Sequence, residues 1–178
     1  MTQSEYQRLL DAAADNLRDT ALITLLLQTG IRLSELCRST IGDVDIATDD
    51  HGGSLRVHAG SRRKDREVPL NAKTRRALSQ YLSERLEDPQ KALCVNRSHN
   101  PLGTRGVQKL VRKYLKIADL PGISVHSLRH TFATHHVAKG TGLKSLQEVM
   151  GHQDIRTTEA YIPFANELVK KELENNSL

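Results

Sequence analysis

A histidine and an arginine stand three residues apart in the segment VHSLRHTFATH, which runs from Val125 to His135. If the segment is helical, His126 and Arg129 lie on one helix face, with Cβ atoms roughly 5–6 Å apart. An arginine guanidinium offers a planar pair of donors to two phosphate oxygens, and a histidine exchanges a proton near neutral pH. The pair therefore suits a site that holds a phosphate and moves protons.

Two other interpretations compete with an anion site. His126 and His130 have the i, i+4 spacing of two helical zinc ligands. However, Ser127 and Arg129 occupy the positions where zinc proteases carry a glutamate, and a fixed cation disfavours a metal ion. A buried polar network explains His130 and the histidines that follow it. It explains Arg129 less well, because residues 124–139 contain no acid to pair with a buried guanidinium.

Three further side chains with suitable chemistry lie elsewhere in the chain. Arg32 follows a glycine in TGIRLSEL, His152 follows Gly151 in GHQD, and Tyr161 comes nine residues after His152. A second arginine would neutralise a phosphate, and a tyrosine hydroxyl can attack it once a base takes the proton. Each residue alone is a weak signal. Their order along the chain is more specific.

This order resembles the tyrosine recombinase family, also called the phage integrase family. The resemblance runs through nearly the whole chain and is strongest in HSLRHTFATH and MGHQDIRTTEAY. It implies that Tyr161 is the nucleophile and that Arg32 and Arg129 clamp the scissile phosphate. By the same resemblance, His126 would move a proton and His152 would hydrogen-bond the phosphate.

One departure from the family pattern concerns the general acid. Family members usually carry a catalytic lysine between the second and third strands, within a G-K-G-x-K-x-R pattern before VPL. In GSRRKDREVPL the position of the first lysine holds Ser61. Lys64 is the only lysine of this turn, so we predict that it protonates the leaving oxygen. Arg62 or Arg63 is the alternative, although an arginine stays charged and is a poor proton donor.

The charge of the chain is unevenly distributed. The formal net charge is +5, and residues 56–76 and 97–116 are rich in lysine and arginine, whereas residues 43–50 and the tail from 159 are acidic. Such blocks predict a basic face that pairs with the phosphates of double-stranded DNA, and a merely solvated surface is the alternative. The predicted phosphate contacts are Arg62, Arg63, Arg66, Arg105, Lys109, Arg112 and Lys113.

The elements that must position these residues are predicted to form a mainly α-helical α+β fold. Thr2 or Ser4 caps a first helix, and an apolar second helix over about 15–28 should be buried. Alternating residues over about 43–70 predict a small three-stranded antiparallel sheet on one side. Further helices are expected from 71 onward and near 104–118, 126–138, 143–150 and 154–161. The helix near 104–118 should have one apolar and one cationic stripe.

Residues 1–162 are predicted to form the catalytic domain, and residues 163–178 a tail. The tail either packs on its own domain or is exchanged between protomers. Family members carry an N-terminal core-binding domain that closes round the DNA, and we expect this chain to lack it. Recombining family members form a tetramer on DNA, whereas the chain alone is expected to be a monomer.

The resemblance implies site-specific DNA recombination, meaning integration, excision or resolution, through a covalent 3′-phosphotyrosine. No metal, ATP or other cofactor is required, since one phosphodiester is exchanged for another ester. A type IB topoisomerase, which reseals the original strand, and a DNA-binding module with a degraded active site are the alternatives. A metal-dependent nuclease is disfavoured because no carboxylates cluster near His126.

The expected location is the prokaryotic cytoplasm, in association with the nucleoid. No apolar run approaches the roughly 20 residues that cross a bilayer, so no membrane partner is expected. Cys37 and Cys94 have neither a disulfide framework nor the spacing of a metal site.

Overall fold

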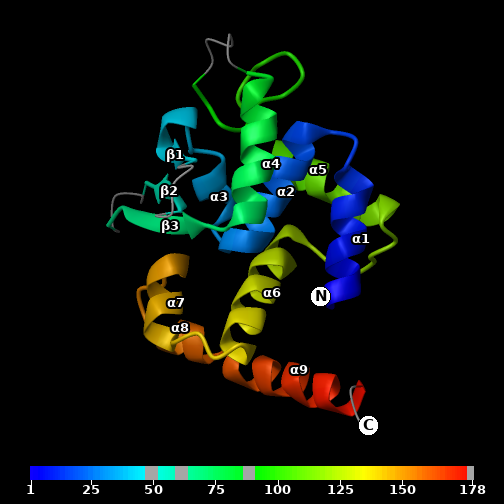
Figure 1. The fold of residues 1–178 in the computed structure, drawn as a ribbon, viewed down its shortest axis with the longest axis vertical. Helices are drawn as coiled ribbons and strands as arrows, with labels where there is room; N and C mark the ends of the chain where they lie inside the picture. The colour runs from blue at the N-terminus through cyan, green and yellow to red at the C-terminus, as the bar shows by residue number, and fades with distance from the viewer. Residues whose placement is uncertain (47–51, 59–63, 86–90, 176–178) are drawn as a thin grey trace.

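The structure is a computed structural model that describes residues 1–46, 52–58, 64–85 and 91–175. Figure 1 shows a group of helices (α1, α2, α4 and α5), a small sheet at one side of it, and α6 leading away toward α7, α8 and α9. The predicted fold class is confirmed: the chain is mainly α-helical and carries one three-stranded antiparallel sheet.

Two N-terminal helices form the base of the core. α1 (Gln3–Ala13) begins with a capping box, in which the Thr2 hydroxyl accepts from the Glu5 backbone N–H and the Glu5 carboxylate accepts from that of Thr2. α2 (Leu17–Thr29) is buried on nearly all sides, as its apolar sequence predicts. It ends at Gly30, whose φ of 60° is left-handed. A Cβ at this position would lie 2.3 Å from the Phe132 ring, so only glycine fits the turn.

The sheet follows the short helices α3 (Leu33–Leu36) and η1 (Ile41–Asp43). Strands β1 (Val44–Asp45), β2 (Gly53–Val57) and β3 (Arg66–Leu70) pair in sequence order. The side chains of one face alternate with solvent-facing ones and enter the core: Leu55, Val57, Val68 and Leu70. The pattern of alternation within residues 43–70 therefore identified the sheet.

Two long helices come between the sheet and the C-terminal part along the chain. α4 (Ala72–Ser83) is capped by Asn71 and packs against α2. α5 (Thr104–Ile117) has the two predicted stripes. Its core stripe is Val107, Leu110, Val111, Tyr114 and Leu115. Its solvent-facing stripe, together with Arg105 in the first turn, is Lys109, Arg112, Lys113 and Lys116.

The C-terminal part consists of α6 (Val125–Ala138), α7 (Leu143–Met150), α8 (Arg156–Glu159) and α9 (Ile162–Asn175). α6 contacts α2, α7 and α9, and a small second core of Phe132, Ala133, Leu146 and Met150 joins it to α7. Residues 163–175 of the tail are thus helical and pack on α6 of their own chain. None of the helices in the described ranges combines the length and the apolarity that a bilayer span requires.

The helix expected near 154–161 is shorter than predicted. α8 ends at Glu159, and Tyr161 lies in the turn between α8 and α9. Pro163 explains the break, because its nitrogen carries no hydrogen to donate to the Glu159 carbonyl. A proline in the first turn of a helix costs no hydrogen bond, so a new helix begins there instead.

Candidate active site

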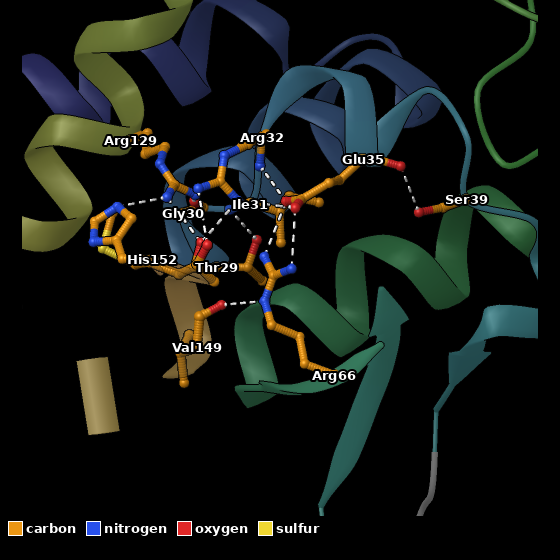
Figure 2. A network of polar contacts seen from close by, with 12 residues as sticks. Thr29, Gly30, Ile31, Arg32, Glu35, Ser39, Arg66, Arg129, Val149 and His152 are labelled. Atoms are coloured by element: carbon orange, nitrogen blue, oxygen red, sulfur yellow. Dashed lines mark hydrogen bonds and ion pairs between the residues drawn. The ribbon is translucent and has the colours of Figure 1, made fainter. Parts of the chain in front are cut away.

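Arg129 lies between His152 and Arg32 in the polar cluster of Figure 2. It projects from α6, is only 7% exposed, and its guanidinium donates to the carbonyl oxygens of Gly30 and Met150. The distance from its Nη2 to the Met150 oxygen is 2.8 Å, and the same nitrogen lies 2.8 Å from Nε2 of His152. Arg129 therefore joins the end of α2 to the end of α7.

Arg32 reaches the same place from the N-terminus of α3. Its Nη1 donates to the Met150 oxygen at 3.2 Å, and its Nη2 donates to the Gly151 oxygen at 2.9 Å. The two guanidinium groups consequently share the carbonyl of Met150. The structure places side by side the two arginines for which the sequence predicts a joint phosphate clamp.

The two like charges are held together by negative groups. The carbonyls at the C-terminus of α7 carry the negative end of the helix dipole. Burial lowers the pKa of Arg129, with a further contribution from the charge of Arg32, to about 10. Arg129 therefore keeps its charge at neutral pH.

Glu35 is the acid of this cluster, and its side chain is only 3% exposed. Burial raises its pKa, but the hydrogen bonds from Arg66 and from the Arg32 backbone outweigh burial and lower the pKa to about 2. The carboxylate is ionised at neutral pH and offsets part of the arginine charge. The sequence interpretation missed Glu35, although its position three residues after Arg32 is the spacing at which it accepts the Arg32 backbone N–H.

His152 is held in one orientation by its neighbours. Its Nε2 accepts from Arg129, so Nδ1 carries the proton and donates to the Thr158 hydroxyl at 2.8 Å. The backbone of His152 exchanges hydrogen bonds with Gln147 in α7. Thr158, which the sequence interpretation also missed, thus fixes the ring from α8.

Tyr161 lies beside this histidine. Its ring is nearly parallel to that of His152, with centroids 6.3 Å apart, and meets the ring of His130 edge-on at 5.1 Å. Burial lowers the pKa of His130, so this ring is neutral at neutral pH and serves as packing. The Tyr161 hydroxyl has no hydrogen-bond partner in the part of the chain that the structure describes, which leaves it available for chemistry.

The two predicted proton-transfer residues lie outside this cluster of contacts. His126 is exposed in the first turn of α6, one turn before Arg129, and Lys64 is exposed two residues before β3. Neither makes a hydrogen bond or an ion pair with residues of the described ranges. Their roles stay predictions, whereas Arg32, Arg129, His152 and Tyr161 are brought together.

Comparison with known proteins gives this geometry its context. The sequence model of the phage integrase family matches residues 1–167. The chain belongs to the phage integrase family. Its relatives include tyrosine recombinase XerC of Bacillus subtilis, 35% identical over 162 residues, which are 86% of this chain and 52% of that protein. Tyrosine recombinase XerA of Pyrococcus horikoshii is 33% identical over 181 residues, covering 100% of this chain and 61% of the relative.

A solved structure supports the same assignment. The crystal structure of XerA recombinase matches 100% of this chain and 63% of its own chain, with a TM-score of 0.88 and 28% sequence identity. The chain thus spans about half to three-fifths of the length of these relatives.

The predicted DNA contacts of this family member fall into three groups. Arg62 and Arg63 lie outside the described residues. Four side chains are exposed along α5, as a phosphate-binding stripe requires: Arg105, Lys109, Arg112 and Lys113. Arg66, in contrast, turns inward, where it donates to both Glu35 carboxylate oxygens and to the Val149 carbonyl. We therefore leave Arg66 out of the proposed phosphate contacts, because both terminal nitrogens of its guanidinium already pair with the two carboxylate oxygens of Glu35.

The described ranges contain no group of three histidine, cysteine, aspartate or glutamate side chains arranged to hold a metal ion. The polar cluster consists instead of cations, carbonyls and one carboxylate. Such a composition suits the binding of a phosphate.

Proposed function

We propose that this chain is the catalytic part of a site-specific DNA recombinase, which cleaves and rejoins double-stranded DNA through a covalent 3′-phosphotyrosine. One observation carries the proposal. The guanidinium groups of Arg32 and Arg129 meet at the Met150 carbonyl, and His152 and the Tyr161 ring lie beside them. This is a cationic site with a nucleophile at its edge.

The chemistry follows from these positions. Arg32 and Arg129 bind the nonbridging oxygens of the scissile phosphate and stabilise the charge that develops in the transition state. The Tyr161 oxygen attacks phosphorus and loses its proton to His126. The bond from phosphorus to the 5′ oxygen breaks, and that oxygen takes a proton.

We assign the second proton transfer to Lys64, since an ammonium group donates a proton far more readily than a guanidinium. A free 5′ hydroxyl then attacks the phosphotyrosine, and each proton moves in the reverse direction. One phosphodiester replaces another, so the cycle consumes neither ATP nor any other energy source. Attack by the 5′ end of a second DNA molecule completes strand exchange.

The likeness to proteins named tyrosine recombinases favours strand exchange over resealing of the original strand. We assign the catalytic domain to residues 1–162 and contacts with DNA phosphates to the cationic stripe of α5. Assembly of several protomers on recombining DNA, with or without exchange of the segment 163–178, is part of the same proposal. The bacterial and archaeal sources of the relatives favour the prokaryotic cytoplasm and the nucleoid as the place of action.

The test uses a nicked suicide duplex that carries a candidate core site, from which the cleaved end diffuses away. The unmodified chain should form a covalent DNA adduct that maps to the Tyr161 peptide and forms in the presence of EDTA. Tyr161→Phe should bind the same duplex with unchanged affinity and form no adduct. An adduct that persists in Tyr161→Phe would contradict the assignment.

A further inference from the structure

The end of α7 is held by guanidinium groups from three different elements. Four consecutive residues, 149–152, accept these hydrogen bonds (Figure 2). Nε of Arg66, in β3, donates to the Val149 carbonyl at 2.7 Å. Arg32 and Arg129 donate to the acceptors of residues 150–152. Arg66 is therefore the third member of the set, although the mechanism above gives it no contact with DNA.

Arg66 also shares an acid with Arg32. Its two terminal nitrogens donate to the two carboxylate oxygens of Glu35 at 3.0 and 2.9 Å, which is the parallel arrangement of a bidentate pair. The same oxygens accept from Nη1 of Arg32 at 3.1 Å and from the Arg32 backbone N–H at 2.8 Å. Glu35 thus accepts four hydrogen bonds, and its orientation is fixed jointly by Arg66 and Arg32.

The path of Arg66 depends on the residue that precedes His152. A Cβ on Gly151 would lie 2.9 Å from Cζ of Arg66, and the φ of Gly151 is 64°. Glycine accepts this left-handed conformation and leaves room for the guanidinium. The turn that presents His152 is consequently packed directly on Arg66.

We propose that Arg66 is a positioning residue for the cleavage reaction: it fixes the acid that orients Arg32 and the helix end that presents His152. The inference rests on the proposed function of the site. It also connects the hairpin of β2 and β3 to the phosphate clamp. Lys64 stands two residues before Arg66 in the chain, so Arg66 anchors the start of β3 close in sequence to the predicted general acid.

Two substitutions separate the charge of Arg66 from its shape. Arg66→Lys keeps the charge but cannot form the parallel pair with Glu35. Arg66→Met removes the charge, so that Glu35 keeps the guanidinium of Arg32 but loses that of Arg66. Arg8→Met is the matched control, because Arg8 is exposed on α1 and its loss changes the net charge equally.

The measurements are the single-turnover rate of adduct formation on the suicide duplex, the DNA affinity by fluorescence anisotropy, and the melting temperature. Misplacement of a catalytic group by about 1 Å can cost on the order of 100-fold in rate, so we expect losses of about 10-fold for Arg66→Lys and about 100-fold for Arg66→Met. DNA affinity should change no more than in Arg8→Met. Cleavage by a folded Arg66→Lys at the rate of the unmodified chain would overturn the proposal. In case Arg66→Met does not fold, Arg66→Lys is the variant that decides.

A double variant tests whether Arg66 acts through Glu35. In Arg66→Met with Glu35→Gln no buried carboxylate is left without its partner. Residues that act as one unit are not additive, so the double variant should cleave no more slowly than Arg66→Met. A loss equal to the product of the two single losses would show that Arg66 acts independently of Glu35 and would overturn this pathway.

Failure of the proposed function can be told apart from failure of this inference. If the unmodified chain forms no adduct on any core site, the proposed function fails. The positioning role is then decided by NMR: Arg66→Lys should shift the Gly151 amide and the His152 ring resonances, and Arg8→Met should not. Unchanged resonances in Arg66→Lys would overturn the role of Arg66, whatever the chain does to DNA.

Discussion

Glu35 places one negative charge among the cations of the site, and its position has consequences for stability. Hydrogen bonds from Arg66 and Arg32 hold its pKa at about 2, against an ordinary value of 4.5. A carboxylate whose pKa is lowered in the native state stabilises the fold at any pH above its ordinary pKa. This contribution is lost as the pH falls from the ordinary pKa toward the lowered, native pKa. Its size is on the order of 3 kcal/mol.

We therefore expect Glu35→Gln to melt at a lower temperature than the unmodified chain at pH 7. The difference should shrink between pH 4.5 and about 2, where the native carboxylate takes up its proton. Circular dichroism melts over this pH range measure it. Glu148→Gln removes an exposed carboxylate from α7 and serves as the control. A melting difference that stays constant down to pH 2 would contradict the role given to Glu35.

At this scale the sequence reveals local relations better than distant ones. Helix geometry places His126 and Arg129 on one face, because they are three residues apart. The order of the other motif residues indicates which chemistry to expect. The inward path of Arg66 was not predictable, because its acid partner lies 31 residues away in the chain. A basic stretch looks the same in sequence whether a given arginine meets solvent or a buried carboxylate.

At the scale of elements, a histidine between two aspartates lies at the turn end of the β2–β3 hairpin. His58 follows β2, and its ring nitrogens lie 2.7 Å from Asp43 in η1 and 2.9 Å from Asp65 before β3. Both nitrogens can donate only when the ring is protonated. The hydrogen bond to Asp43, and then that to Asp65, raises the pKa of His58.

Because the pKa of His58 is raised in the fold, these contacts stabilise the hairpin fully below the ordinary value near 6.5 and are lost as the pH rises through the higher, native value. We expect the amides of Val57 and Arg66 to lose protection from hydrogen exchange in this range, after correction for the intrinsic effect of pH. NMR exchange rates between pH 6 and 9 measure it. His58→Gln should remove the step, and a step of equal size in that variant would contradict the interpretation.

Several elements were predicted from short-range chemistry. Thr2 or Ser4 was predicted to cap the first helix, and Thr2 is the residue that caps α1. The alternation in residues 43–70 marks the sheet. The end of α8 was placed too late, because the interpretation followed helical residues up to Tyr161 and gave no weight to Pro163. The proline is what puts Tyr161 in a turn, where its ring can face His152 and His130 instead of lying along a helix.

At the scale of the whole molecule, the exposed stripe of α5 should dominate the salt dependence of DNA binding. Each phosphate contact that is lost should lower the slope of log K against log salt concentration by about 0.9. Lys109→Gln and Arg112→Gln should each show this change. Lys113→Gln should show less, because Lys113 lies 4.5 Å from the centre of the Tyr114 ring and donates to its hydroxyl.

Fluorescence anisotropy titrations at several salt concentrations measure these slopes. Lys171→Gln is a suitable control, since Lys171 on α9 is paired with Glu167. The cleavage rate at saturating protein should be unchanged in the α5 variants, because they lie outside the arginine cluster. Slopes equal to that of the unmodified chain would assign the DNA contacts to another face.

The carbonyls of Gly30, Met150 and Gly151 immobilise two long, flexible cations before any nucleic acid arrives. A free arginine side chain has rotamer entropy worth about 2 kcal/mol, and here that freedom is already lost when the protein folds. In the proposed reaction, the oxygens of a phosphate would replace backbone carbonyl oxygens as hydrogen-bond acceptors of these preorganised donors. Under the proposed function, the two guanidinium groups therefore need no further ordering when a phosphate arrives.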